Sequence, residues 1–437
     1  MASIGKLAGA IGIALMAATP AAAQTTVTWW HALAGQLGAK VDEIAARFNE
    51  SQSEYRVQPV YKGNYTETLT GAIAAFRARE HPHIVQVFEV GTATMMAAEG
   101  AVYPVEDLMR DAGVPFDKSD FLAAVISYYE TPDGRLLSLP FNSSTPVMFY
   151  NKDAFAKAGL NPDEPPETWE AVEEASRALL AAGYSCGFST GWQSWVQIEN
   201  MLAWHNQPMA TQENGFAGLD TEFVFDGEFM TRHIGNMADW SRDNVFVYAG
   251  RRGDSLPKFT TGECPMYMNS SAYFGGITEQ AEFDWGIAML PYYSDVAGAP
   301  QNSIIGGATL WVLRGHDDDA YKGVAEFFRF MSSPEIQADW HQTTGYVPIT
   351  NAAYELSLEQ GFYEDNPGAD VAIRQLTLNP PTENSKGLRF GNFVQIRDII
   401  NDELEAVWSG RKTAAAALKD MVRLGNEQLR RFERQAN

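Results

Sequence analysis

Cysteine is scarce in this chain. Only two of the 437 residues are cysteine, Cys186 and Cys264, and two are too few for a disulfide framework or a cysteine-rich zinc domain. They can pair in an oxidising compartment, but their number alone does not show that they lie close together.

Basic residues are also few. The sequence has 32 Lys and Arg against 55 Asp and Glu, which gives a formal net charge of −23. Such an acidic chain is expected to bind neither nucleic acid nor anionic membranes. An anionic ligand would need a deliberately placed cation, because the overall field repels it.

Long apolar runs are missing except at residues 7–18. Lys6 precedes that run and three alanines ending at Ala23 follow it, which predicts a secretory signal, residues 1–23, cleaved near Ala23. The alternative is a membrane anchor, but the run is short for a bilayer and Pro20 interrupts it. We therefore expect a soluble, exported protein. Loss of Lys6 takes its net charge from −23 to −24.

The mature chain is long enough for two domains. Short β-rich runs alternate with helical patterns in the first third: residues 27–30, 55–61 and 84–88 read as strands. Asn64 and Glu67 form a capping box before a helix that carries Leu69. This order predicts an α/β fold with parallel sheets, in which ligands bind beyond the carboxyl ends of the strands.

Two short motifs suggest other functions. Residues 187–191 read GFSTG and match the nucleophile elbow of a secreted α/β-hydrolase or esterase, with Ser189 as nucleophile and His233, His316 or His341 downstream. No HGGG-type loop precedes the motif, and a Gly/Ser turn is the simpler interpretation. His81 and His83 flank Pro82 without Cys or carboxylate neighbours, which favours a surface turn over a metal site. No phosphate-binding glycine motif is present either. Because both short motifs are more simply interpreted as turns, we expect no metal, no cofactor and no enzyme activity.

Residues 140–159, PFNSSTPVMFYNKDAFAKAG, are the most informative stretch. They contain a Ser/Thr-rich turn and the short apolar strand 147–150, and Thr168 is placed to cap a helix that starts at Trp169. This order resembles the interlobe crossover of extracytoplasmic solute-binding proteins of ABC importers. Further blocks match the same family in order, at residues 259–266, 283–291 and 344–348.

The resemblance implies a two-lobed clamshell fold, each lobe a mostly parallel sheet flanked by helices. It places residues 24–142 and 305–350 in the first lobe and residues 147–302 and 355–437 in the second. The hinge crossovers fall near residues 143–146, 303–304 and 351–354. Cys186 and Cys264 then lie in strand-like runs of one lobe, and we expect them to form a disulfide.

Within the family, residues 61–65, 89–96, 141–146, 305–308 and 379–397 resemble the branch that binds sn-glycerol-3-phosphate. This implies a monomer that delivers this ligand, and glycerophosphodiesters, to a membrane permease; a sugar-binding member is the alternative. The resemblance implies a phosphate site and a glycerol site with these members: Ser144, Ser270, Gly307, Tyr346 and Arg397 for the phosphate, Tyr65, Glu89 and Trp192 for the glycerol.

Arg397 has two interpretations on sequence alone. It is the only full cation among the eight positions, so its loss should weaken ligand binding most while leaving folding nearly unchanged. It also reads as a surface arginine paired with Asp398 or Glu403.

Overall fold

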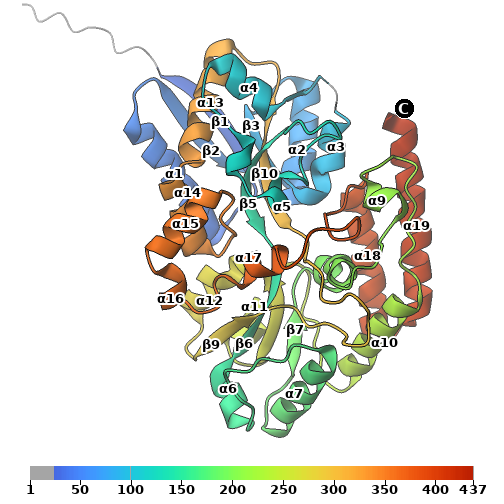
Figure 1. The fold of residues 1–437 in the computed structure, drawn as a ribbon. Coiled ribbons are helices and arrows are strands. Elements are labelled where there is room, and N and C mark those ends of the chain that lie inside the picture. Colours follow the sequence, from blue (N-terminus) through green and yellow to red (C-terminus); the bar gives the residue numbers. More distant parts are fainter. Residues whose placement is uncertain (1–23, 99, 437) are drawn as a thin grey trace, which may run out of the picture.

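The computed structural model describes residues 24–98 and 100–436, so the predicted signal segment lies outside the described residues. Two sheets form two lobes, stacked one above the other in Figure 1, with β5 leading from the upper to the lower. None of the described helices is long and apolar enough to cross a membrane.

The upper sheet has the strand order β2-β1-β3-β10-β4, and β5 pairs with β10. Its strands are β1 Thr25–His31, β2 Tyr55–Tyr61, β3 Ile84–Phe88, β4 Val102–Tyr103, β5 Leu139–Ser144 and β10 Gly306–Leu313. The lower sheet has the order β7-β8-β6-β9. Its strands are β6 Pro146–Asn151, β7 Phe188–Thr190, β8 Met266–Ser270 and β9 Trp285–Ala288.

Helices cover both sheets (Figure 1). Up to the first crossover they are α1 Gly35–Ser51, α2 Tyr65–Ala78, η1 Glu89–Gly91, α3 Thr92–Met96, α4 Val105–Ala112, η2 Lys118–Asp120 and α5 Ala123–Ile126. Between the two crossovers they are α6 Lys152–Lys157, α7 Trp169–Ala181, η3 Trp195–Asn200, α8 Met201–Trp204, α9 Thr211–Gly215, α10 Glu228–Arg242, α11 Leu256–Thr260, η4 Ser271–Tyr273 and α12 Phe274–Gln280. After β10 they are α13 Asp318–Met331, α14 Pro334–Thr344, α15 Asn351–Glu359, α16 Phe362–Asp365, α17 Val371–Leu376, α18 Phe393–Trp408 and α19 Ala414–Ala436.

Several local predictions are confirmed. The Asn64 side chain accepts hydrogen bonds from the N–H groups of Thr66 and Glu67, and the Glu67 side chain accepts one from the Asn64 N–H, which is the predicted capping box. Thr168 caps α7 by accepting from the N–H of Ala171. These contacts form because the first helical N–H groups have no partner within the helix.

The expectation of mostly parallel sheets is wrong. Only β1–β2, β1–β3 and β7–β8 pair in parallel, whereas β10 runs antiparallel to β3, β4 and β5, and β6 runs antiparallel to β8 and β9. The reason lies in the crossovers. β3 and β5 end where the lobes meet, but β10 and β6 begin there, because the chain enters each from the other lobe. They must therefore run in the opposite direction.

Aromatic residues fill both lobes. The Trp29 ring lies edge-on to Phe141 with centroids 5.4 Å apart in the upper lobe, and Trp169 stacks on Trp240 at 5.7 Å in the lower one. A disulfide joins Cys186 and Cys264, whose Cα atoms are 5.0 Å apart, as expected. The Thr145 hydroxyl donates to the Ser303 hydroxyl at 2.6 Å, so a hydrogen bond joins two of the chain segments that connect the sheets.

Candidate functional site

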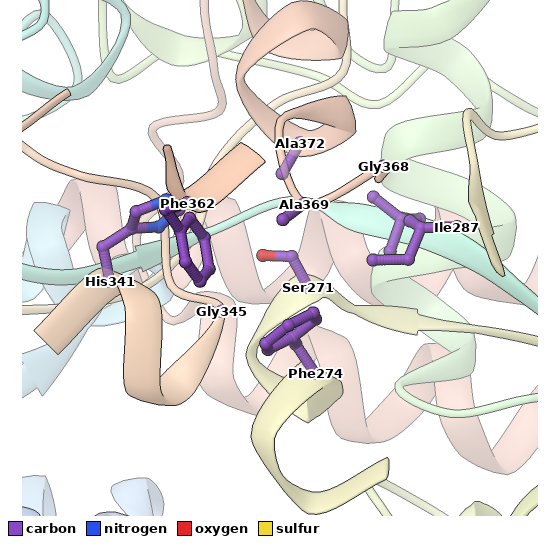
Figure 2. A pocket seen from close by; sticks show the side chains of 10 residues that line it. Ser271, Phe274, Ile287, His341, Gly345, Phe362, Gly368, Ala369 and Ala372 are labelled. Atoms are coloured by element: carbon purple, nitrogen blue, oxygen red, sulfur yellow. The ribbon is translucent and has the colours of Figure 1, made fainter. Parts of the chain in front are cut away.

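A cleft of about 570 Å³ lies between the two sheets and is lined from both. A second cavity beside α17, drawn in Figure 2 with Ser271 between Phe362 and Ile287, encloses only about 10 Å³. That space holds one water molecule at most. The large cleft falls in the size range of small-molecule sites and exceeds a third hollow of about 310 Å³ beside His83 and His316, so it is the candidate site.

All eight predicted residues line this cleft: Tyr65, Glu89, Ser144, Trp192, Ser270, Gly307, Tyr346 and Arg397. The structure therefore brings together residues that are more than three hundred positions apart in the sequence. Five of them are buried, and Tyr65, Trp192 and Gly307 are half-buried.

Tyr65 and Glu89 come from the carboxyl-end loops of the upper sheet. Tyr65 is the first residue of α2, and its ring stacks on Phe88 with centroids 5.2 Å apart. Its hydroxyl accepts from the Asn142 amide at 2.8 Å, and Gln86 donates to the same amide at 2.8 Å. This buried network fixes the direction of the Tyr65 hydroxyl. Glu89 directly follows β3.

Gly307 has a structural reason to be glycine. Its φ is +96°, and an added Cβ would collide with the Asn142 carbonyl of β5. Gly306 pairs with Ser144 in the same ladder, at the end of β5. The backbone of β10 can therefore approach a ligand closely where a side chain would block it.

The lower lobe contributes Trp192 and Ser270. Ser270 ends β8, and its hydroxyl accepts from the Ala272 N–H at 3.2 Å. Trp192 follows β7 in a left-handed conformation with φ +42°. Non-glycine residues rarely adopt this conformation, which costs about 1–3 kcal/mol and is concentrated at functional sites.

Tyr346 follows α14 and stacks on Trp340 with centroids 5.6 Å apart. Its carbonyl accepts from the His341 ring nitrogen at 2.6 Å. Burial raises the pKa of Tyr346 and that of Tyr65. Both phenols are therefore neutral near pH 7 and can donate a hydrogen bond into the cleft.

The surface interpretation of Arg397 is wrong. Its side chain is 7 % exposed and pairs with neither Asp398 nor Glu403. Instead, Nε and Nη2 bind the two carboxylate oxygens of Glu199 at 2.7 and 2.6 Å. Nη2 also lies 2.6 Å from a carboxylate oxygen of Glu89. Because these partners come from different helices, α18 is pinned to the cleft wall.

Two carboxylates thus share one guanidinium in a buried place. Burial lowers the pKa of Arg397, but Glu199 and Glu89 more than offset this effect, so its pKa is raised and it stays charged. Burial raises the pKa of Glu89, and Glu199 adds to the rise while Arg397 opposes it. Glu89 makes one contact to the guanidinium, and this contact offsets only part of the rise that burial causes in its pKa.

Sequence reasoning missed Glu199. It lies in η3, a π-helical segment, and is 1 % exposed. The signal was present as a single acid within an apolar helical run, residues 195–204. A charge that must be buried on such a face needs a buried partner, and π-helical turns frequently occur at functional sites.

The hydrolase and metal motifs do not form sites. Ser189 is fully buried, and its hydroxyl has no hydrogen-bond partner among the described residues. His233 bonds Gln197, and His341 bonds Tyr363 and the Tyr346 carbonyl. In residues 24–98 and 100–436, no group of three His, Cys, Asp or Glu side chains could hold a metal ion.

The sequence is similar to those of known solute-binding proteins. The profile of the bacterial extracellular solute-binding protein family matches residues 43–370. The sn-glycerol-3-phosphate-binding periplasmic protein UgpB of Yersinia pseudotuberculosis is 51 % identical over 436 residues, covering 100 % of this chain and 99 % of that protein. Its counterpart from Salmonella typhimurium is 50 % identical over 428 residues, covering 97 % of this chain and 98 % of its own.

Solved structures share the fold. UgpB of Mycobacterium tuberculosis in complex with glycerophosphocholine superimposes with a TM-score of 0.79 at 23 % identity, covering 93 % of this chain and 99 % of that one. The GacH receptor of Streptomyces glaucescens gives 0.77 at 18 % identity, covering 94 % and 99 %. At these identities the likeness establishes the two-lobed fold alone.

Proposed function

This chain belongs to the bacterial extracellular solute-binding protein family, and from that premise we propose that it captures sn-glycerol-3-phosphate and delivers it to the permease of an ABC importer. One observation carries the proposal: all eight residues assigned to this ligand from the sequence line a single interlobe cleft. In addition, the curated relatives at about half identity bear the name of the same ligand.

The phosphate end would bind to Ser144, Ser270, the Gly307 N–H, Tyr346 and Arg397. These groups are donors, and hydroxyl, amide and guanidinium donors match phosphate oxygens. They come from both sheets, so the phosphate would bridge the lobes and favour the closed state through contacts that the open state lacks.

The glycerol end would bind to Tyr65, Glu89 and Trp192. A carboxylate accepts from vicinal hydroxyls, and an indole face covers their C–H side. The cleft is larger than a three-carbon phosphate ester needs. A glycerophosphodiester, whose phosphate carries a second alcohol, is therefore included in the proposal. A sugar is disfavoured because sugars lack the anion that these donors suit.

The same proposal covers compartment and chemistry. The protein would act as a monomer in the periplasm after cleavage near Ala23, and would release its ligand unaltered. Its lobes would be residues 24–142 with 305–350 and residues 147–302 with 355–437. The buried, unpartnered hydroxyl of Ser189 supports the absence of esterase activity.

Calorimetry of the ligand-stripped mature protein tests the proposal. Its panel is glycerol-3-phosphate, glycerophosphocholine, inorganic phosphate and maltose, and we expect the first two to bind. Ser144→Ala removes a donor to an anion, which costs about 1.5–3 kcal/mol and weakens binding by tenfold or more. Ser143→Ala is the matched control, because Ser143 neighbours Ser144 on β5 and does not line the cleft.

Binding of maltose alone would replace the proposal with a sugar-binding function. Equal effects of the two serine variants would place the phosphate elsewhere. Release of free glycerol or choline that is lost in Ser189→Ala would show an esterase instead.

A further inference from the structure

The charged side chains that line the cleft do not give it a net positive charge for an anion. Its lining has two cations, Arg397 and Arg252, and two acids, Glu89 and Glu279. Arg397 already contacts Glu89 and Glu199 at 2.6 Å each. This three-residue group carries a net charge of −1 when both acids are ionised. A phosphate ester approaching Arg397 therefore meets an excess of negative charge.

Arg252 is the other cation of the lining. No ion pair within residues 24–98 and 100–436 involves Arg252. Asp398 lies near enough to interact with Arg252 electrostatically: burial raises the pKa of Asp398, while Arg251 and Arg252 oppose the rise. The adjacent Arg251 binds Glu405 at 2.6 Å and also pairs with Asp402. Of these two neighbouring arginines, Arg251 is half-buried in an ion-pair network, whereas Arg252 is exposed and lines the cleft.

The backbone around Arg252 is built into the site. Arg252 has φ +57° and Trp192 has φ +42°, so two non-glycine residues of the same cleft wall adopt the left-handed conformation. The Trp192 N–H donates to the Arg252 carbonyl at 2.9 Å. At Gly253 an added Cβ would collide with the hydroxyl of Tyr273, another lining residue. Strain held by such packing is typical of functional segments.

We propose that Arg252 is a further ligand-binding residue of this cleft, which supplies the phosphate of the captured ester with a positive charge that no ion pair among the described residues takes up. The inference rests on the proposed function of the same site. Arg397 then serves mainly to orient the phosphate through its guanidinium, with Glu199 holding it in place. Arg252 provides net attraction from the lower lobe.

The proposal predicts a dependence on ligand charge. Near pH 7 the phosphate of glycerol-3-phosphate carries close to two negative charges, whereas the phosphate of glycerophosphocholine carries one. Arg252→Gln should weaken glycerol-3-phosphate binding by about tenfold, within the range for a partly screened charge pair. The loss for glycerophosphocholine should be smaller, about threefold, because the Coulomb energy scales with charge.

Calorimetry at two salt concentrations measures both losses. Arg251→Gln is the matched control, since it removes an equal charge from the adjacent residue outside the cleft, and we expect affinities within twofold of wild type. The salt dependence of glycerol-3-phosphate binding should be shallower in Arg252→Gln than in wild type. Arg252→Lys keeps the charge and should retain most of the affinity, which separates a lost charge from a disturbed loop.

Wild-type affinity in Arg252→Gln would overturn the inference while the proposed function stands. Equal losses for the two ligands, or Arg252→Lys as weak as Arg252→Gln, would also overturn it. A wild-type protein that binds neither ester would refute the proposed function itself, so the two failures are distinguishable.

Discussion

Arg397→Ala should destabilise the ligand-free protein strongly, contrary to the expectation from sequence that it leaves folding unchanged. The variant removes three contacts of 2.6–2.7 Å and leaves the carboxylates of Glu89 and Glu199 buried without their cation. Breaking a buried ion pair from one side costs about 3–5 kcal/mol. We expect a loss of that size in the free energy of urea unfolding, followed by tryptophan fluorescence without ligand.

The loss should depend on pH. Without the guanidinium, two carboxylates share a buried site, and their repulsion favours a shared proton in the folded variant. The unfolded chain releases that proton above the ordinary glutamate pKa of 4.5. The folded state then binds more protons than the unfolded state, and stability falls as pH rises, by about 1.4 kcal/mol per pH unit for one proton. Adding Glu199→Gln removes one of the two charges and should recover part of the loss.

Arg423→Ala is the control. Arg423 is 58 % exposed and pairs with Asp420 and Glu427 on α19. Exposed pairs contribute about 0–1 kcal/mol, so this variant should unfold almost as the wild type does. If Arg397→Ala unfolded within about 1 kcal/mol of wild type, with no dependence on pH, then the Glu89–Arg397–Glu199 group would not exist in solution.

Three further predictions concern stability. Burial lowers the pKa of His205 to about 4, so on acidification the unfolded chain takes up a proton that the folded state does not. The free energy of unfolding of the wild type should therefore fall as pH drops from about 6.5 to about 4. His205→Gln should reduce this pH dependence, measured by unfolding at several pH values, by about one proton. Replacing Cys186 and Cys264 by alanine opens a loop with a sequence separation of 78 and should cost about 4 kcal/mol in urea unfolding. Asn64→Ala removes a helix cap that accepts two hydrogen bonds and should lower the free energy of unfolding by about 1 kcal/mol.

Each of these three predictions has an outcome that would contradict it. An unchanged acid slope in His205→Gln would mean that this ring titrates normally. Equal sensitivity of wild type and the double alanine variant to dithiothreitol would mean that the thiols are not bridged. A neutral Asn64→Ala would mean that water satisfies the first turn of α2 equally well.

Local structure was largely determined by the sequence. The Asn64 capping box and the Thr168 cap appeared where residue types predicted them, because each depends on side chains within a few positions of one another. The apolar residues of α1 recur at helical spacing and form its buried face, which is likewise a local pattern. The site positions came from the resemblance carried by several separate blocks, and the cleft gathers all eight.

Only the tertiary structure decided strand direction and the charge balance of the cleft. β10 and β6 run antiparallel to their neighbours because the chain enters them from the opposite lobe, which no local pattern records. Sequence neighbours do not tell a paired arginine from a free one: Arg397 is followed by Asp398, and Arg252 lies between Arg251 and Gly253. The fold buries Arg397 between Glu89 and Glu199 and leaves Arg252 on the cleft wall without an ion pair to any described residue. Whether a charge is free depends on groups more than a hundred residues away, and so on packing rather than on sequence order.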